Sequence, residues 1–191
     1  MRKQWIWLLV LAGLVVTVVV SVSGKLMENK EEKQLLSHMQ EKYGESFEIA
    51  EPYAGQFGKA YTSYILESKR YPDENVLARI RENSGNYDIE DNYIAILLKK
   101  DLEKVVEELS VNVWGECNVT YQVPMQVFPE YFDTEMEPEA FLKDSASNPK
   151  FFIVPVNRKS KGDLEAGLEL FLDACKKEGY GMRGCVDALN E

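Results

Sequence analysis

The chain has 191 residues, of which 22 are basic and 32 are acidic, and its formal net charge at pH 7 is −10. Nucleic-acid binding needs clustered lysine and arginine, so this balance argues against a nucleic-acid partner. Hydrophobic residues make up 45% of the chain and aromatic residues 11%. This composition is sufficient for a folded core and argues against a disordered protein.

The first feature along the chain is a run without charge over residues 5–24, preceded by Arg2 and Lys3 and closed by Lys25. A helix of this length spans about 30 Å, the thickness of the hydrocarbon core of a bilayer. The leucine, isoleucine and valine residues of the run favour insertion by roughly 4 to 7 kcal/mol. We therefore predict a signal anchor, or transmembrane helix, over residues 1–24 that places the protein in the cell membrane.

Two interpretations of this run stay open. It is longer than the apolar region of a secretory signal, which is usually about 7–15 residues long, and this length favours a retained single-pass anchor. Small residues at Ser21, Ser23 and Gly24 also fit a cleavage site, and cleavage there would release a secreted protein. The short basic N-terminus resembles that of an export signal, so we expect the folded domain outside the cytoplasm.

Beyond the anchor we predict a membrane-proximal helix over residues 25–44 and one extracytoplasmic α+β domain over residues 45–191. The helix begins with a charged segment typical of a solvated spacer. His38, the single histidine of the chain, is expected on its surface. With one histidine, a catalytic or metal site that needs two is excluded.

Alternating apolar residues predict a three-stranded antiparallel meander with strands near residues 47–49, 61–66 and 76–80. A loop is expected at residues 83–86. Apolar residues at helical spacing then predict a long amphipathic helix from about Asp91. Three carboxylates that a helix N-terminus would stabilise precede or begin this helix: Asp88, Glu90 and Asp91.

The second half of the domain is predicted to alternate strands and helices: a strand over 119–127, a short helix over 139–143 after Pro138, a strand over 151–156, a helix from Asp163 to Gly179, and a short strand near 183–186. The last helix should bury one apolar face made of Leu164, Leu168, Phe171, Leu172 and Cys175. Together these elements predict a mostly antiparallel sheet with helices covering one face.

An acidic stretch over residues 130–139, EYFDTEMEPE, is a candidate docking loop for a basic partner. The carboxylates that would make the contact are Glu130, Asp133, Glu135 and Glu137. The alternative, which we favour, is an exposed connection whose aromatic residues hold it to the core.

A basic segment over residues 157–162, NRKSKG, lies between a predicted strand and the start of a helix. Arg158, Lys159 and Lys161, together with free backbone N–H groups, would bind an anion there. The hypothesis is contact with an acidic partner or a polyanionic polymer of the cell wall, and the alternative is an ordinary polar connection.

The three cysteines, Cys117, Cys175 and Cys185, cannot all pair within one chain. Cys175 is expected to be a small core residue. A bridge from Cys185 to either of the other two is compatible with an oxidising compartment, and the spacing does not choose between them. The absence of a CxxC pair from the sequence argues against a redox motif and a structural zinc site.

The chain contains none of the sequence motifs GxSxG, HExxH, GxxxxGK[ST] or GxGxxG. We therefore expect no catalytic residue set, metal or cofactor, and we expect a membrane-anchored domain that binds another protein or an envelope component. Two alternatives stay open: a structural subunit of a secretion or conjugation apparatus, which rests on similarity of layout, and an envelope enzyme that uses carboxylates alone.

Overall fold

The computed structural model describes residues 30–53, 61–115, 117–148, 150–157 and 161–189; for residues 156–157, 161–162 and 183–189 it describes the backbone alone. The predicted anchor over residues 5–24 and the start of the spacer lie outside these ranges. Within them, no helix combines the length and the apolar character that crossing a bilayer requires. The anchor therefore stays a prediction.

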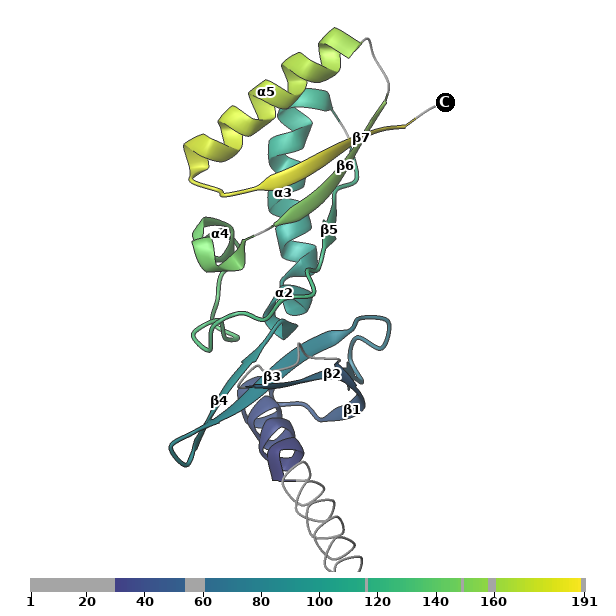
Figure 1. The fold of residues 1–191 in the computed structure, drawn as a ribbon. Helices are drawn as coiled ribbons and strands as arrows, with labels where there is room; N and C mark the ends of the chain where they lie inside the picture. Colours follow the sequence, from purple (N-terminus) through teal and green to yellow (C-terminus); the bar gives the residue numbers. More distant parts are fainter. Residues whose placement is uncertain (1–29, 54–60, 116, 149, 158–160, 190–191) are drawn as a thin grey trace, which may run out of the picture.

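The protein is α+β, as predicted, and its described residues form two sheets where the sequence predicted one. In Figure 1 the first sheet and the helix over residues 30–43 form the lower part of the molecule, and the second sheet with α3, α4 and α5 forms the upper part. Each part has its own cluster of buried apolar side chains. Leu97 and Val123 pack against both clusters.

The lower sheet is an antiparallel meander of β1 (Phe47–Tyr53), β2 (Thr62–Ser68), β3 (Val76–Asn83) and β4 (Asn86–Asp91), in that order. The helix over residues 30–43, here called helix 30–43, covers one face of this sheet. Its Leu35 and Met39 are fully buried. The side chains they join come from the inward-facing positions of the strands: Tyr64, Leu66, Val76, Ala78, Ile80 and Ile89.

The predicted loop at residues 83–86 is a two-residue turn that leads into a fourth strand, β4. Ser84 and Gly85 have φ angles of 54° and 89°, as in the tight turns that match the twist of a hairpin. Acidic residues are rare in strands, which is why the sequence of β4, NYDIED, resembled the start of a helix. The predicted three-stranded meander was therefore wrong by one strand.

The predicted long helix begins after β4 and is interrupted once. Asp91 is the last residue of β4; α2 (Tyr93–Leu97) and α3 (Lys99–Trp114) follow, with Leu98 between them. The inward residues Leu102 and Val106 are fully buried, as the helical spacing predicted.

The predicted strand over residues 119–127 was mostly wrong. Only β5 (Thr120–Gln122) forms, and Met125, which lies within the predicted strand, is 46% exposed. Pro124 has no N–H to give to a sheet, and its carbonyl accepts a hydrogen bond from Asn92 instead. The chain next meets the lower sheet at Phe128, through a single antiparallel bridge to Asp91.

In the rest of the upper part four elements form as predicted: α4 (Pro138–Lys143), β6 (Phe151–Asn157), α5 (Lys161–Glu178) and β7 (Arg183–Leu189). A 3-10 turn that was not predicted, η1 (Ser145–Ser147), lies between α4 and β6. The upper sheet has the order β5-β6-β7, with β5 antiparallel and β7 parallel to β6. A β-α-β crossover through α5 connects the parallel pair. Gly179, with φ of 79°, ends α5.

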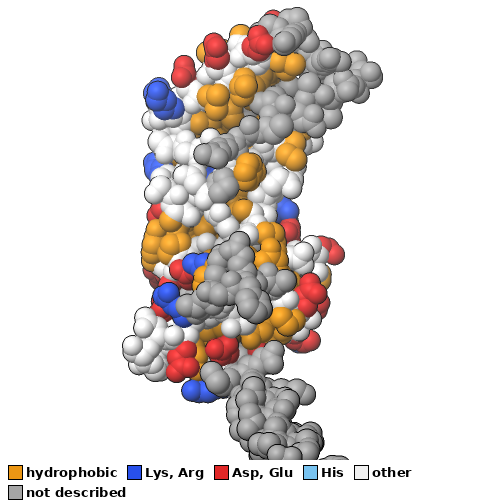
Figure 2. All heavy atoms as spheres, in the orientation of Figure 1, with side chains coloured by type: hydrophobic (Ala, Val, Ile, Leu, Met, Phe, Trp, Pro, Cys, Tyr) orange, Lys and Arg blue, Asp and Glu red, His pale blue; other side chains and the backbone are white. Residues whose placement is uncertain are grey.

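One residue of the apolar face predicted for α5 is misplaced. Phe171 and Cys175 are buried, but Leu172 is 43% exposed. Trp114 of α3 packs on Phe171 with ring centroids 5.2 Å apart and lies so close to Gly167 that a Cβ there would come within 2.3 Å of its indole nitrogen. This contact turns the Phe171 side of α5 inward. Apolar side chains along the upper part are visible in Figure 2.

The corner between β4 and α2 joins the two parts. Asn92 is fully buried and continues the ladder beyond β4: its N–H donates to the carbonyl of Leu77 (3.0 Å), and its Oδ1 accepts from the N–H of Leu77 (2.8 Å). Its Nδ2 donates to the carbonyl of Pro124 at 3.1 Å. The carbonyl of Asp91 accepts from the N–H of Phe128 at 2.8 Å. These bonds connect the lower sheet to the segment that follows β5.

We predict that Asn92→Ala lowers the free energy of unfolding by about 3 kcal/mol, because it leaves the buried N–H of Leu77 and the carbonyl of Pro124 without their partner. Urea unfolding of the full chain in detergent micelles measures this. Asn112→Ala is the matched control, since the exposed Asn112 amide bonds only to the Glu108 carbonyl of its own helix, and it should cost about 0.5 kcal/mol or less. Equal losses in the two variants would contradict the role given to Asn92.

Candidate functional site

The strongest candidate site is a groove between helix 30–43 and the β3–β4 hairpin, here called the β4 groove. Its volume is about 450 Å³. From the helix it is lined by Lys30, Gln34, Ser37, His38 and Glu41, and from the hairpin by Gly85, Asn86, Tyr87 and Ile89. Most of these side chains are polar, so the groove suits a ligand that makes hydrogen bonds.

The helical wall of the β4 groove is one face of helix 30–43. Its lining residues are spaced by four, three, one and three positions, which places them on the same side of an α-helix. Leu35 and Met39, on the side facing the sheet, are fully buried and hold this wall in place. Lys30, at the end of the groove, lies 5.6 Å above the ring of Tyr87.

The other wall includes the outer edge of β4, which ends the lower sheet. In an antiparallel pair, the backbone groups of successive residues point alternately toward and away from the partner strand. The N–H of Asn92 points toward β3, because it bonds to Leu77. Counting back from Asn92, the backbone N–H and C=O groups of Glu90 and Asp88 also point toward β3. Those of Ile89 and Tyr87 point away from it.

The bridge to Phe128 agrees with this alternation, because the carbonyl of Asp91 points outward and accepts a hydrogen bond from the N–H of Phe128. Among the described residues, no strand pairs with the outer edge of β4 at Tyr87 or Ile89. The β4 groove therefore presents two residues whose N–H and C=O groups are directed away from the sheet.

A buried ionic cluster fixes helix 30–43 beside this edge. The carboxylate of Asp91 accepts hydrogen bonds from Lys42 Nζ (2.9 Å), the Tyr43 hydroxyl (2.7 Å) and the Tyr93 N–H (2.8 Å). Burial raises the pKa of Asp91, and the charge of Lys42 and the bond from Tyr43 oppose that rise. Burial, followed by the neighbouring Asp91, raises the pKa of Tyr43. The helix is thus fastened to the last residue of β4.

His38 is not the solvated surface residue that the sequence predicted. It is half-buried, and its Nε2 is buried without a hydrogen-bond partner among the described residues. The sequence places His38 between the exposed Ser37 and the buried Met39, and spacing alone did not show on which side the imidazole would lie.

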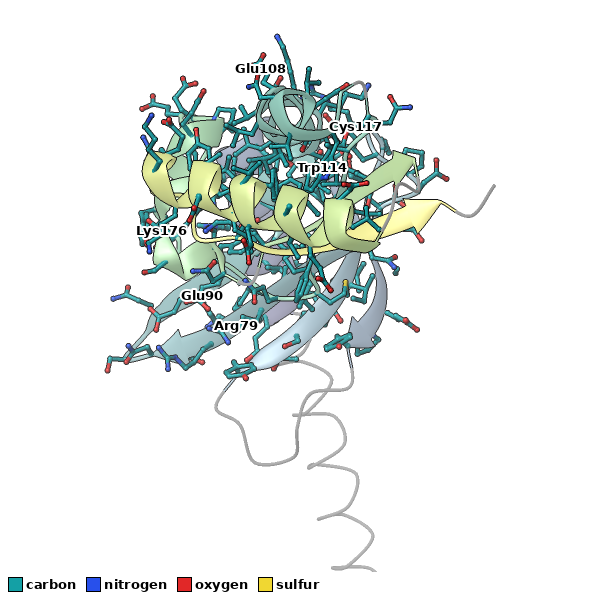
Figure 3. All side chains as sticks on the ribbon, turned by 90° about the horizontal axis from the view of Figure 1, so that it is seen from above. Arg79, Glu90, Glu108, Trp114, Cys117 and Lys176 are labelled. Carbon is teal, nitrogen blue, oxygen red and sulfur yellow. The ribbon has the colours of Figure 1, made fainter. Side chains whose placement is uncertain are left out.

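The three carboxylates expected at a helix N-terminus have other partners. On the face of the lower sheet away from helix 30–43, Arg79 pairs with Glu90, and Arg81 pairs with Asp88 at 2.6 Å. Figure 3 shows Arg79 and Glu90 extending side by side from neighbouring strands. Hydrogen bonds, first from Arg81, lower the pKa of Asp88. These two carboxylates are cross-strand partners of arginines.

The acidic stretch over residues 130–139 is an exposed connection held by aromatic residues, as favoured from the sequence. Phe132 is fully buried against Phe128 and Phe141, while Tyr131 is 56% exposed and donates to the carboxylate of Asp144. Three of the proposed docking residues are exposed: Glu130, Glu135 and Glu137. The fourth, Asp133, is half-buried, and its carboxylate accepts a hydrogen bond from the N–H of Glu135. Docking of a basic partner there stays a prediction.

The basic segment lies largely outside the described residues. Arg158 and Lys159 are not described, and Lys161 is described only as the backbone at the start of α5. Anion binding by these three residues stays a prediction.

Cys117 is half-buried and Cys175 is buried, and the two are not bridged to each other. Burial raises the pKa of Cys175 to about 12, which fits the predicted core residue. The side chain of Cys185 lies outside the described part, so the pairings proposed for it stay predictions. No group of three or more histidine, cysteine, aspartate or glutamate side chains suited to a metal ion occurs within the described part of the chain.

A buried lysine was missed by the sequence analysis. Lys150 is fully buried, and its ammonium donates to the carbonyls of Asp144 (3.0 Å) and Gly181 (3.3 Å) and to Oδ1 of Asn148 (3.2 Å). Burial lowers its pKa to about 8. It joins the end of α4 to the segment before β7. A lysine beside a proline and an asparagine reads as a surface loop residue, so no sequence signal pointed to it.

We predict that the wild-type protein gains stability relative to Lys150→Met as the pH rises from 7 to 10. The folded pKa of Lys150, about 8, lies below the unfolded value of about 10.4. The unfolded state therefore binds more protons in this window, and stability rises by up to about 1 kcal/mol per pH unit. Urea unfolding of both proteins at several pH values measures the difference. A constant difference would contradict the burial of a charged amine at this position.

Comparisons with known proteins assign no family to this chain. No family profile matches the chain, and no curated protein matches it. The crystal structure of a DUF5037 family protein from Ruminococcus gnavus aligns with 82% of this chain and 73% of that chain, at 17% sequence identity and a TM-score of 0.42. The α+β class and the β4 groove therefore rest on this chain's own geometry.

Proposed function

We propose that the protein is a single-pass membrane protein whose α+β domain lies outside the cytoplasm and binds another protein or an envelope component in the β4 groove. The observation that supports this proposal best is the groove itself, because polar side chains line it and one wall belongs to β4, an edge strand that no described strand covers at Tyr87 or Ile89. Clefts that combine an outward strand edge with a helix are used by several protein families to bind extended ligands.

The position of the groove along the chain supports the same proposal. The charge-free run is closed by Lys25, and Lys30, the first described residue of helix 30–43, follows five residues later. Because a chain extends by at most about 3.6 Å per residue, Lys30 would lie within roughly 20 Å of the membrane surface. A ligand held beside Lys30 would therefore be a component of, or close to, the envelope.

A carboxylate-dependent enzyme receives less support from the described residues. Asp88 and Glu90, the two carboxylates that share a hollow of about 100 Å³, are paired with Arg81 and Arg79 there. Hydrolysis by paired carboxylates needs one of them protonated, whereas an arginine partner favours the ionised form. The subunit of a secretion or conjugation apparatus remains compatible with the proposal, since such a subunit also binds neighbouring proteins.

We predict that the full chain sediments with membranes and is released only by detergent. Val15→Lys combined with Val18→Lys should move most of the protein to the supernatant, because each central lysine costs roughly 3 kcal/mol and the two together offset the gain from the run. Glu28→Lys, outside the run, is the control and should leave sedimentation unchanged. A reporter that is active only outside the cytoplasm, fused after Glu191, should be active. Wild-type protein in the supernatant, or an inactive but well-expressed fusion, would contradict the placement.

We also predict that Ser37→Trp reduces recovery of the bound envelope component at least about tenfold, since an indole at this lining position occupies the groove. Gln40→Trp is the matched control, because Gln40 is exposed on the same helix and does not line the groove. Quantitative mass spectrometry of material copurified from detergent measures both. Equal recovery with the two variants would contradict binding in the groove.

A further inference from the structure

The two edges of the lower sheet differ in how they are protected. β1, at one edge, carries a register shift between Ile49 and Glu51 and then Pro52; irregularities and prolines of this kind prevent another strand from adding. β4, at the other edge, pairs with β3 without a register shift and contains no proline. Its three carboxylates are each paired with a cation of this chain: Asp88 with Arg81, Glu90 with Arg79 and Asp91 with Lys42. The unprotected edge is the one that lies in the β4 groove.

The geometry points to the occupant: we propose that an extended segment of another polypeptide adds to β4 as a fifth strand, antiparallel to it. This inference rests on the proposed function, because it names the ligand of the same groove. Tyr87 and Ile89, whose backbone groups point outward, each exchange an N–H and a C=O with the added segment. The open stretch from Asn86 to Glu90 therefore takes about five residues of the partner.

The chain itself begins such a strand and does not continue it. Phe128 pairs with Asp91 in an isolated antiparallel bridge, and the N–H of Phe132 then bonds back to the carbonyl of Pro129 in a turn. A strand that continued the register of the Phe128–Asp91 bridge would next pair with the outward N–H and C=O groups of Ile89 and then of Tyr87. The added segment continues the direction and the register of this bridge.

The side chains of the groove select the chemistry of the segment. A residue opposite Tyr87 or Ile89 points to the same face of the sheet as they do, and that face is covered by helix 30–43. Glu41 lines the groove, is exposed, and has no ion-pair partner among the described residues. Lys30 at the other end already lies over Tyr87. The segment therefore carries lysine or arginine at a helix-facing position.

A second copy of this chain fits the edge less well. Two copies would each bring a net charge of −10, and like charges oppose close association. A basic segment of a different polypeptide meets the acidic domain with complementary charge, which favours encounter and correct partner choice.

The test measures backbone amide exchange by NMR on the full chain in lipid nanodiscs. The probe is a capped ten-residue peptide that alternates valine with lysine or threonine. We expect it to slow exchange of the Tyr87 and Ile89 amides at least about tenfold. The amides of Asp88 and Glu90 point toward β3 and are internal controls, whose exchange should not change. No slowing at Tyr87 and Ile89 overturns strand addition.

Control peptides separate main-chain pairing from other binding. Replacing two valines by proline, or the lysines by glutamate, should remove the slowing. N-methylation of one alternate set of residues should abolish it, and methylation of the other set should leave it, because only one set turns its N–H groups to β4. Equal effects of the two methylated peptides overturn the proposal, and this result does not depend on any variant of the protein folding.

Two further measurements distinguish this proposal from the proposed function. The first uses a soluble chitin tetrasaccharide as a neutral polyhydroxylated probe. If it shifts the NMR signals of Gln34 and Ser37 while the peptide slows no amide exchange, strand addition is overturned and ligand binding in the groove is retained. The second measures amide exchange at Tyr87 and Ile89 without peptide at several protein concentrations. If exchange slows as the concentration rises, a second copy of the chain occupies the edge, and the choice of partner is overturned. If neither probe affects the groove, the proposal and the proposed function both fail.

Discussion

The rest of the structure depends on how the chain leaves β4 through Asp91 and Asn92. The two sheets share no continuous ladder. Hydrogen bonds of Asp91 and Asn92 connect the lower sheet to the segment after β5, and Leu97 and Val123 pack against both apolar clusters. Asn92 gives Leu77 both a donor, its backbone N–H, and an acceptor, its Oδ1, and its Nδ2 donates to the carbonyl of Pro124. A side chain of another length or with one polar atom fewer would leave buried backbone groups unpaired.

Asp91 connects the same corner to helix 30–43. Burying a carboxylate is costly unless a positive partner and further hydrogen bonds compensate, and here Lys42, Tyr43 and the Tyr93 N–H supply them. Removing Lys42 would leave a buried charge without its counterion, so the helix and the strand must stay together. If residues 5–24 span the membrane, this contact fixes the open edge of β4 close to the bilayer surface.

The sequence predicted those elements whose pattern is local. The α+β class, α4, β6 and β7 follow from apolar runs, a proline at a helix start and glycine at helix ends. β4 was missed because its acidic residues pair with Arg79 and Arg81 on a neighbouring strand, and that pairing is visible only once the hairpin forms. β5 was predicted too long because the strand expected over residues 119–127 runs through Pro124, whereas β5 ends before this proline.

The candidate site shows the same division. The lining residues of helix 30–43 lie on one helical face, but the sequence did not show that a strand edge lies beside them. The backbone groups of Tyr87 and Ile89 point outward because the bond from Asn92 to Leu77 sets the alternation along β4. The buried ammonium of Lys150 is satisfied by the carbonyls of Asp144 and Gly181, which lie far apart in the chain. The charged segments that the sequence singled out are exposed, half-buried at Asp133, or outside the described residues, and no described contact joins them to the groove.

The corner at Asp91 and Asn92 holds helix 30–43 and both sheets together as one body. The most direct measurement is the distance distribution between spin labels placed at Lys33 of helix 30–43 and Lys177 of α5, by pulsed electron paramagnetic resonance on the full chain in lipid nanodiscs. The account predicts one narrow distribution. A broad or two-peaked distribution in the wild-type chain would contradict it.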